Sequence, residues 1–442
     1  MDTDAFTRLQ RAPSRPLHDA ILNRTATVGI VGLGYVGLPL LTAASAEGFP
    51  VIGLDSDARR VGSLLAGQSY VVDILDQDLA ALGPAQFTTD RAALRTADVI
   101  IMAVPTPLTD GVPDLSLVRG ASQDVAAALR PGQLVVLEST TYPGTTEEIV
   151  RPVLETSGLE AGRDFYLGYS PERIDPGRSH NFRDTPKIVS GIGECDADLV
   201  ELFYSQLVDT VVRTPGTREA EMAKLVENTF RQVNIALVNE LATLAPELGG
   251  DIWAAIEAAA SKPFGFMPFW PGPGVGGHCI AIDPSYLSWR VGQRLGFGIG
   301  FVEHAKEVNN RMPAYVAGRI GEALNEAGKP IKGSKIMALG LAYKADVNDV
   351  RESPSMLVMD RLARAGAVCS YHDPYVPAVR LFGEELRSQP LDPDVLGTQD
   401  CVAILTAHEA VNYAAVVLSA PLVFDGTGVT RRLLQAPNVV RL

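Results

Sequence analysis

A glycine-rich turn near the start of the chain constrains the fold more than any other feature. An apolar run, 27–31, leads into the pattern GxGxxG, whose glycines are Gly32, Gly34 and Gly37, and a helix-forming stretch, 36–47, follows. In such a strand–turn–helix unit, glycines permit a tight turn and close approach of the backbone to a ligand. The helix N-terminus offers N–H groups to a pyrophosphate. The pattern therefore predicts a dinucleotide-binding unit.

An acidic residue after the next apolar run supports this prediction. The run 51–54 is followed directly by Asp55, about where a carboxylate accepts hydrogen bonds from the adenosine ribose of a dinucleotide. Because a carboxylate repels a 2′-phosphate, NAD is favoured over NADP. Arg60 lies nearby and argues in the other direction. Without this context, GxGxxG could be a glycine turn in any α/β protein.

Further apolar runs alternate with helical stretches in two parts of the chain. The strand candidates lie at 27–31, 51–54, 99–104, 134–138 and 165–169 in the first part, and at 335–340, 367–371, 401–405 and 422–424 in the second. In the second part, Ser353 is a candidate N-cap before Pro354. Apolar runs that alternate with helices are typical of parallel sheets covered on both faces. The predicted fold class is α/β, with two Rossmann-like, doubly wound parallel-sheet domains joined by a central helical domain with one long helix.

The segment between the two parts has a helical period. From Thr217 to about residue 248, apolar residues recur at three- and four-residue steps: Ala223, Val226, Phe230, Val233, Leu237, Leu241 and Leu244. Thr217 is a candidate N-cap, and Glu219 and Glu221 lie in the first turn, where the helix dipole favours negative charge. This segment is predicted to be one long helix.

Composition and charge argue against several classes of protein. The net charge of −14, from 38 basic and 52 acidic residues, argues against nonspecific nucleic-acid binding. No apolar run approaches the ~20 residues of a membrane span. Residues 1–24 lack the apolar core of a secretory signal. The four cysteines form no CxxC pair, so neither a zinc site nor a disulfide framework is indicated. We expect a cytoplasmic protein with no metal, nucleic-acid or membrane partner.

The most unusual stretch is the sequence PGPGVGGHC, which ends at Cys279. Glycine and proline dominate before the cysteine, so the backbone can approach a ligand and the thiol is expected to be accessible. This favours a nucleophile, whereas Cys195, Cys369 and Cys401 are interpreted as small buried hydrophobic residues. His278 either activates the thiol or makes a backbone contact.

Two polar residues share one face of the predicted long helix. Lys224 and Asn228 are four residues apart, so their side chains point the same way. A cation and an amide donor on one face could stabilise a developing oxyanion. They could equally belong to a solvated polar face together with Glu227 and Arg231. The residues alone leave both interpretations open.

A series of motifs in order resembles the UDP-glucose/GDP-mannose dehydrogenase family over nearly the whole chain, from about residue 25. The motifs are GLGYVGLP at 32–39, VPTPL at 104–108, ESTTYPGTT at 138–146, SPERIDPG at 170–177, EMAKLVENTFRQVNIALVNE at 221–240, PGPGVGGHC at 271–279 and GLAYKADVNDVRESP at 340–354. The resemblance implies an NAD-dependent, four-electron oxidation of the C6 hydroxyl of a UDP-hexose to a uronic acid, through a cysteine thiohemiacetal and thioester. It also implies a homodimer or higher homo-oligomer.

The resemblance further implies roles for individual residues and domains. The implied catalytic residues are Cys279, Lys224, Asn228, Asp283, Glu172 and Thr140. The implied NAD contacts are Gly32, Gly34, Val36, Gly37, Asp55, Arg60, Thr106, Thr140 and Arg351. The implied substrate contacts are Glu172, Lys224, Asn228, Gly272, Gly274, Gly276, Gly277 and Lys344. The implied domains are an N-terminal extension at 1–24, an NAD-binding Rossmann domain at 25–213, a central helical domain with the catalytic loop at 214–330 and a UDP-sugar-binding α/β domain at 331–442.

The sugar is the least constrained part of this expectation. The stretch 262–289 is most similar to the branch of the family that oxidises UDP-N-acetylglucosamine, and UDP-N-acetylmannosamine and UDP-glucose are the alternatives. Ala281 is the residue of the N-acetylmannosamine branch. Thr427 stands where many relatives have a diphosphate-binding arginine, and Arg431 and Arg432 are candidates to replace it. Two less favoured functions are a two-electron hydroxyacid-type dehydrogenase and an inactive nucleotide-sugar-binding protein.

Overall fold

The computed structural model describes residues 15–442 except 72, 174–181, 278 and 434–435. The chain divides into two compact units. Unit 1 consists of Met1–Glu227 and Trp289–Leu295, and unit 2 consists of Asn228–Ser288 and Gly296–Leu442. The long helix α9 (Thr217–Leu244) begins in unit 1 and continues in unit 2.

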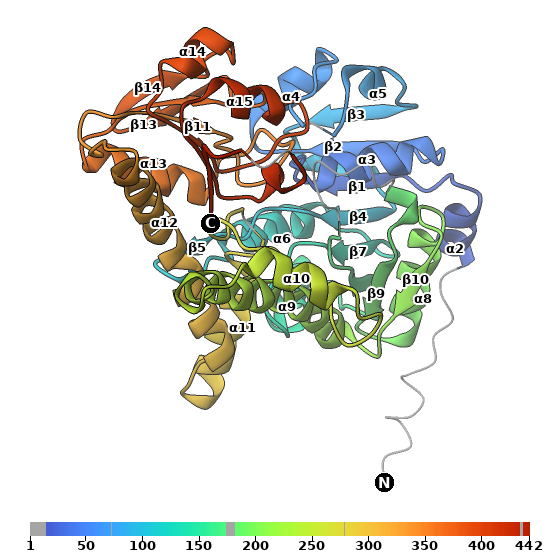
Figure 1. Ribbon diagram of the computed structural model, residues 1–442. Coiled ribbons are helices and arrows are strands. Elements are labelled where there is room, and N and C mark those ends of the chain that lie inside the picture. The colour runs from blue at the N-terminus through green and yellow to red at the C-terminus, as the bar shows by residue number, and fades with distance from the viewer. Residues whose placement is uncertain (1–14, 72, 174–181, 278, 434–435) are drawn as a thin grey trace. The chain divides into compact units, whose positions relative to one another are not determined.

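Unit 1 is built on one large sheet. Its described residues form an 8-stranded sheet in the order β10-β9-β8-β7-β4-β1-β2-β3 (Figure 1). The strands are β1 (Val28–Val31), β2 (Val51–Leu54), β3 (Ala85–Thr88), β4 (Val99–Met102), β7 (Leu134–Leu137), β8 (Tyr166–Tyr169), β9 (Lys187–Gly191) and β10 (Val211–Arg213). Strands β1, β2, β4 and β7 are buried along their whole length, as expected for strands that helices cover on both faces. The sheet is parallel except where β8 pairs with β9 in the antiparallel direction.

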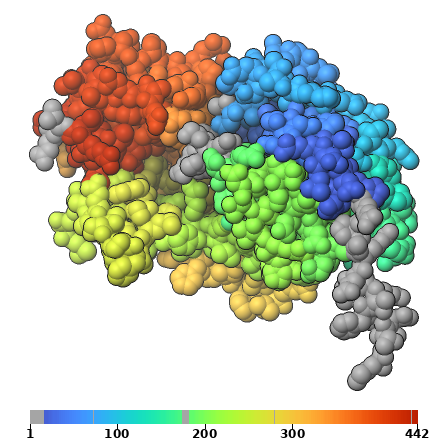
Figure 2. Space-filling view, turned by 90° about the vertical axis from the view of Figure 1, so that its right-hand side faces the viewer, coloured from blue at the N-terminus to red at the C-terminus, as the bar shows by residue number. Residues whose placement is uncertain are grey.

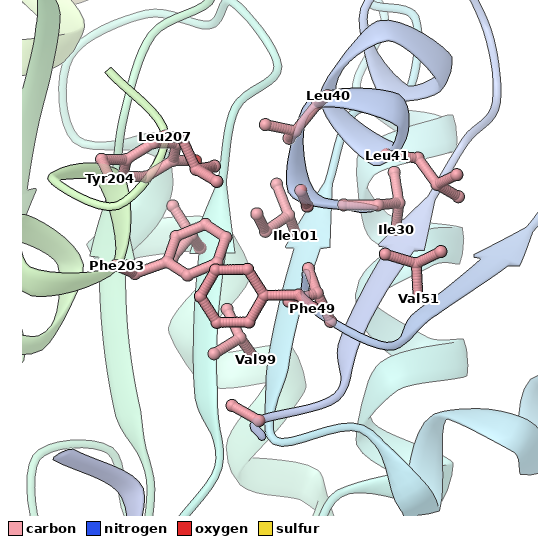
Figure 3. Close-up of a cluster of buried hydrophobic side chains, with 14 of the residues drawn as sticks. Ile30, Leu40, Leu41, Phe49, Val51, Val99, Ile101, Phe203, Tyr204 and Leu207 are labelled. Carbon is pink, nitrogen blue, oxygen red and sulfur yellow. The ribbon is translucent and has the colours of Figure 1, made fainter. Parts of the chain in front are cut away.

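The helices of unit 1 enclose an apolar core against this sheet. They are α2 (Arg15–Leu22), α3 (Gly37–Ala46), α4 (Ala58–Leu65), α5 (Asp76–Ala80), α6 (Ser116–Ala128), α7 (Arg151–Leu154) and α8 (Glu194–Tyr204). Figure 3 shows the rings of Phe49 and Phe203, whose centroids are 5.8 Å apart, beside Val99 and Ile101. Helix α2 packs against α8, and the two lie side by side in Figure 2. The described part of the predicted N-terminal extension therefore adds to this core.

Unit 2 contains a second, smaller parallel sheet. Its described strands have the order β12-β11-β15-β16-β17, and every neighbouring pair is parallel. They are β11 (Lys335–Leu339), β12 (Val368–His372), β15 (Cys401–Ile404), β16 (Val423–Asp425) and β17 (Val439–Arg441). The helices are α10 (Ile252–Ala260), α12 (Gly300–Glu326), α13 (Pro354–Arg364), α14 (Pro393–Gly397) and α15 (Tyr413–Ser419), and α11 (Asp283–Leu295) runs from unit 2 into unit 1. The predicted fold class is confirmed, while the predicted domain boundaries stay a prediction.

Helix α9 buries a different face from the one that its apolar period suggests. Most of the predicted apolar positions are exposed: Val226, Phe230, Leu237, Leu241 and Leu244. The buried positions include a row of polar residues: Glu221, Lys224, Asn228, Gln232 and Asn239. The solvated-face interpretation of Lys224 and Asn228 is therefore wrong. Across the described chain, no helix combines the length and hydrophobicity that a membrane span requires.

Two hydroxyl groups that were predicted to cap helices make no capping bond in the structure. Thr217 is the first residue of α9 rather than its cap, and its hydroxyl donates to Glu147 Oε1 at 3.1 Å. Ser353 does occupy the N-cap of α13 before Pro354, but its side chain makes no capping bond. The sequence thus indicated where the helices begin, but it did not predict the partners of these hydroxyl groups.

Candidate active site

The glycine turn after β1 has the geometry of a ligand-binding backbone. Gly32 has a φ of 94°, which favours glycine. A Cβ atom on Gly37 would lie 1.8 Å from the carbonyl oxygen of Gly32, so only glycine fits there. A Cβ atom on Gly34, in contrast, would meet nothing within 4 Å. The N-cap of α3 is Val36, whose side chain makes no capping bond, and a helix N-terminus directly after such a turn suits an anion such as a pyrophosphate.

Asp55 follows β2 and is tied to this turn. Its carboxylate accepts hydrogen bonds from the backbone N–H groups of Leu33 at 2.9 Å and Asp57 at 2.8 Å. The guanidinium of Arg60 lies 3.4 Å from Asp55 Oδ2 and 5.7 Å from the centre of the Tyr70 ring. Arg60 therefore contacts the acidic residue itself, and its position does not by itself indicate a 2′-phosphate site.

The remaining predicted NAD contacts lie in both units. In unit 1, Thr106 is buried after β4 and Thr140 is half-buried after β7. In unit 2, the guanidinium of Arg351 donates to the carboxylate of Asp349, with the closest atoms 2.6 Å apart. The roles of these residues toward NAD stay predictions.

Lys224 and Glu172 form a buried ion pair in unit 1. The Lys224 ammonium donates to the Glu172 carbonyl oxygen at 2.6 Å and lies 3.4 Å from Glu172 Oε2. Burial raises the pKa of Glu172, although Lys224 and Lys187 act in the opposite direction. Two opposite charges that are shielded from water depend strongly on each other, since removing one leaves the other uncompensated.

The sequence analysis missed a second group of buried charges in unit 1. The Lys187 ammonium lies 2.7 Å from Glu138 Oε1, and the Tyr204 hydroxyl donates to the same oxygen at 2.5 Å. Burial and the neighbouring Glu138 raise the pKa of Tyr204 well above its usual value. An acidic residue directly after the apolar strand β7 and a lysine at the start of β9 are the signal that could have identified this group.

Glu221 has a different role from the one predicted for it. The acidic residue in the first turn of α9 is Glu219, whereas Glu221 lies in the next turn and is fully buried. Its carboxylate accepts from the backbone N–H of Gly144 at 2.5 Å and from the N–H and hydroxyl of Thr146 at 2.8 and 2.7 Å. Glu221 thus joins α9, one turn before Lys224, to the segment that follows Thr140.

Cys279 lies in unit 2, in a turn that α9 holds. The backbone N–H of Asp283 donates to the Cys279 carbonyl oxygen at 2.8 Å. The Asn228 amide nitrogen donates to Asp283 Oδ2 at 2.6 Å, and the Gln232 amide nitrogen donates to the Ile280 carbonyl oxygen at 3.4 Å. The two amides of α9 therefore anchor the turn around an exposed thiol.

The other cysteines differ from Cys279 in burial. Cys401 is buried and Cys369 is half-buried, and burial raises their pKa values to about 12 and about 11. Cys195 is also only half-buried, so the predicted full burial holds for Cys401 and not for the other two. Since the thiolate is the nucleophilic form, the exposed Cys279 is the best candidate among the four for covalent chemistry.

The glycines before Cys279 are required by packing within unit 2. A Cβ atom on Gly277 would lie 2.5 Å from the Tyr343 ring, and one on Gly276 would lie 2.7 Å from the carbonyl oxygen of Glu352. Gly274 has a φ of 138°, and the N–H of Gly272 donates to Asn239 Oδ1 at 2.9 Å. The loop therefore rests closely on the segment around residues 343–352, which includes Lys344. His278 and residues 174–177 of the SPERIDPG motif lie outside the described residues.

The candidates to replace an arginine at position 427 have other neighbours. The Thr427 hydroxyl donates to Asp425 Oδ1 at 3.0 Å. The Arg431 guanidinium forms two hydrogen bonds with Glu257, at 2.9 and 2.8 Å, and lies 5.5 Å from the centre of the Trp253 ring. Arg432 is exposed. A diphosphate contact by Arg431 would have to compete with its pairing to Glu257.

Comparison with known proteins gives consistent matches along the chain. Three models of the UDP-glucose/GDP-mannose dehydrogenase family match: the NAD binding domain at 26–208, the central domain at 218–311 and the UDP binding domain at 337–432. A UDP-N-acetyl-D-mannosamine dehydrogenase of Pyrococcus horikoshii is 34% identical, over 93% of this chain and 97% of the relative. A UDP-N-acetyl-D-glucosamine 6-dehydrogenase of Pseudomonas aeruginosa is 35% identical, over 86% and 90%. The solved structure of a UDP-D-ManNAc dehydrogenase from Pyrococcus horikoshii matches with a TM-score of 0.84 at 33% identity, over 94% of this chain and 98% of that chain.

Proposed function

The chain belongs to the UDP-glucose/GDP-mannose dehydrogenase family and is an NAD-dependent UDP-sugar dehydrogenase, and from this premise we propose that it oxidises the C6 hydroxyl of UDP-N-acetylglucosamine to a carboxylate. The observation that carries the proposal is the exposed thiol of Cys279, in a turn that Asn228 and Asp283 anchor. A two-electron oxidation of an alcohol needs no such thiol. Oxidation to the acid passes through an aldehyde, which a thiol can bind covalently.

The residues of unit 1 suit NAD, which would accept one hydride in each of two oxidation steps. The backbone at Gly32–Gly37 and the first turn of α3 would hold the pyrophosphate, and the Asp55 carboxylate would accept hydrogen bonds from the ribose. In total, one alcohol, two NAD⁺ and one water give one carboxylate, two NADH and three protons.

Cys279 retains the carbon that is oxidised. Its thiolate adds to the aldehyde carbon to form a thiohemiacetal, whose oxidation gives a thioester. Water then cleaves the carbon–sulfur bond and the thiolate leaves. The Lys224 ammonium and the Asn228 amide are proposed to donate hydrogen bonds to the oxyanion formed in these steps, at roughly 3–4 kcal/mol of barrier for each donor. Asp283 and Glu172 are proposed to position and deprotonate the water.

The product count tests this proposal directly. Purified protein is incubated with NAD⁺ and a panel of UDP-hexoses, and NADH is measured together with the mass of the sugar product. We expect two NADH for each sugar and a uronic acid. One NADH for each sugar would indicate a two-electron dehydrogenase. Measurable UDP-sugar binding without NADH would indicate a binding protein.

UDP-N-acetylmannosamine is the second candidate substrate. Two observations favour it: Ala281 in the cysteine loop, and the similarity of this chain to the UDP-N-acetyl-D-mannosamine dehydrogenase of Pyrococcus horikoshii. The same panel decides between the two sugars, since the preferred epimer will show the higher kcat/KM.

We also propose that the protein forms a homodimer through α9. A row of apolar side chains on this helix is exposed: Val226, Phe230, Leu237, Leu241 and Leu244. A helix with one apolar row can pack against a second copy of itself about a two-fold axis, so that the same residues serve on both sides. We expect sedimentation to show a dimer that Leu237→Glu dissociates. A monomeric wild type would contradict this arrangement.

A further inference from the structure

Unit 2 contains a buried histidine that the proposed mechanism does not use. His408 is 1% exposed and lies in the connection between β15 and α15. Its Nε2 atom is 3.1 Å from Asp373 Oδ2, at the end of β12. Its Nδ1 atom is 2.9 Å from the backbone nitrogen of Asp346. One imidazole ring thus joins three segments that are far apart in the sequence.

The neighbours of His408 determine its tautomer. A backbone N–H can only donate, so Nδ1 must accept the hydrogen bond from Asp346 and carries no proton. Nε2 then carries the proton and donates it to the Asp373 carboxylate. The two nitrogen atoms have separate tasks: Nε2 anchors the ring to β12, and Nδ1 holds Asp346.

Asp346 lies in a strained turn that needs such an anchor. We call residues 341–352 the substrate turn, because it carries Lys344. Two of its residues, Asp346 and Glu352, have positive φ angles of 62° and 52°. A left-handed conformation is unfavourable for a residue with a side chain. The hydrogen bond to His408 offsets part of this cost, as does the bond from the Glu409 N–H to Asp346 Oδ1 at 3.0 Å.

The substrate turn also supports the glycine-rich loop that precedes Cys279. Gly276 and Gly277 approach Tyr343 and Glu352 so closely that neither could carry a Cβ atom without displacing its neighbours. The Gly277 N–H also donates to the Arg351 carbonyl oxygen at 3.4 Å. A shift of the turn would therefore move the backbone that precedes Cys279.

We propose that His408 is a positioning residue for the UDP-sugar: its Nδ1 atom fixes the substrate turn through the Asp346 N–H, and the turn sets the places of Lys344 and of the loop before Cys279. This inference rests on the proposed function, because that function makes Lys344 and the loop substrate contacts. His408 itself is buried and does not touch the substrate.

Two matched substitutions separate the tasks of the two nitrogen atoms. In His408→Asn the amide oxygen can replace Nδ1 as the acceptor for Asp346, and the bond to Asp373 is lost. In His408→Gln the amide nitrogen can replace Nε2 as the donor to Asp373, and the Asp346 N–H loses its acceptor. Both variants are uncharged and each keeps one of the two bonds.

The expected result is a difference between the variants in KM for the UDP-sugar. We expect His408→Gln to raise this KM about tenfold, the effect of one lost buried hydrogen bond, and to leave KM for NAD⁺ unchanged. His408→Asn should stay within about twofold of the wild type. Equal KM values for the two variants, or an effect on thermal stability alone, would overturn the inference.

Two further measurements keep the test decisive. Calorimetric titration with UDP reports substrate-turn binding without turnover, so it tests His408 even if the wild type oxidises no UDP-sugar and the proposed function fails. Hydrogen exchange on the wild type needs no variant to fold. The Asp346 amide should be strongly protected, and exchange at the rate of an exposed amide would contradict the anchor.

Discussion

The two sheets of the molecule begin with the same local arrangement and use it differently. In each, the first strand is followed directly by a glycine with positive φ, Gly32 at 94° in unit 1 and Gly340 at 81° in unit 2. In each, an aspartate directly follows the neighbouring strand, and its carboxylate accepts the N–H of the residue after the glycine. The distances are 2.9 Å for Asp55 and 2.8 Å for Asp373.

The two aspartates differ in how fully their oxygen atoms are used. Among the described residues, Asp55 accepts from two backbone N–H groups and from Arg60. Over the same part of the chain, Asp373 accepts from four backbone N–H groups and from His408. A carboxylate has about four lone-pair sites, so the Asp373 carboxylate is saturated within unit 2 and is poorly suited to bind a ribose.

The helices that follow the two turns differ in the same way. In unit 1, α3 begins at Gly37, directly after the turn, and a helix N-terminus in that place favours a pyrophosphate. In unit 2, α13 begins only at Pro354, after the whole substrate turn. A glycine and an aspartate at neighbouring strand ends are therefore not enough to indicate a dinucleotide site. The spacing between glycine and helix makes the distinction.

The largest expected effect separates the two units by function. Cys279→Ala removes the thiol that is proposed to hold the aldehyde and should reduce acid formation below detection, while the affinity for NAD⁺, assigned to unit 1, stays within about twofold. Product mass and NAD⁺ titration measure the two quantities. Normal acid formation by the variant would remove Cys279 from the mechanism. Cys195→Ala is a matched control for the loss of a thiol and should be active.

The second prediction compares the two aspartates by isosteric substitution. Asp373→Asn turns one acceptor oxygen into a donor that faces N–H groups, so we expect the free energy of unfolding to fall by about 3 kcal/mol or more. Asp55→Asn should cost about 1 kcal/mol of stability, weaken NAD⁺ binding and reduce the preference over NADP⁺. Denaturant unfolding and cofactor titration measure these effects. A larger loss of stability for Asp55→Asn would contradict the contrast between the two carboxylates.

The fold and the local cofactor turn could be predicted from the sequence because both depend on short-range patterns. The strands predicted from apolar runs lie within a residue or two of their expected bounds, and β2 lies at Val51–Leu54 as predicted. The burial of Lys224 and Asn228 could not be predicted, because the apolar period of α9 favoured the opposite face. His408 and Asp373 are far apart in the sequence, and nothing in the residues near either one indicates that they meet.

The smallest expected effect is a contrast in pH dependence between buried acids of the two units. Burial raises the pKa of both Asp373 and Glu221, and both accept several hydrogen bonds, yet the net result is a lowered pKa for Asp373 and a pKa of about 7 for Glu221. At Asp373 the hydrogen bonds from His408 and from backbone N–H groups outweigh burial, whereas at Glu221 burial outweighs the bonds from Thr146 and Gly144, and the nearby Glu147 adds to the rise.

The sign of each contribution to stability follows from these shifts. The unfolded Glu221 carboxyl ionises near its usual pKa of 4.5, and the folded one near 7. Between these values the unfolded state loses its proton first, so ionisation destabilises the fold as the pH rises. Relative to the wild type, Glu221→Gln should therefore gain stability by at most about 3 kcal/mol between pH 4 and pH 8. The contribution of Asp373 has the opposite sign, since a lowered pKa stabilises the fold above the unfolded pKa and the benefit is lost as the pH falls. Denaturant unfolding of Glu221→Gln between pH 4 and pH 8, and of Asp373→Asn below the usual Asp pKa of 3.8, measures the two slopes. Slopes of the same sign would show that burial, rather than the hydrogen-bond donors around each carboxyl group, governs both.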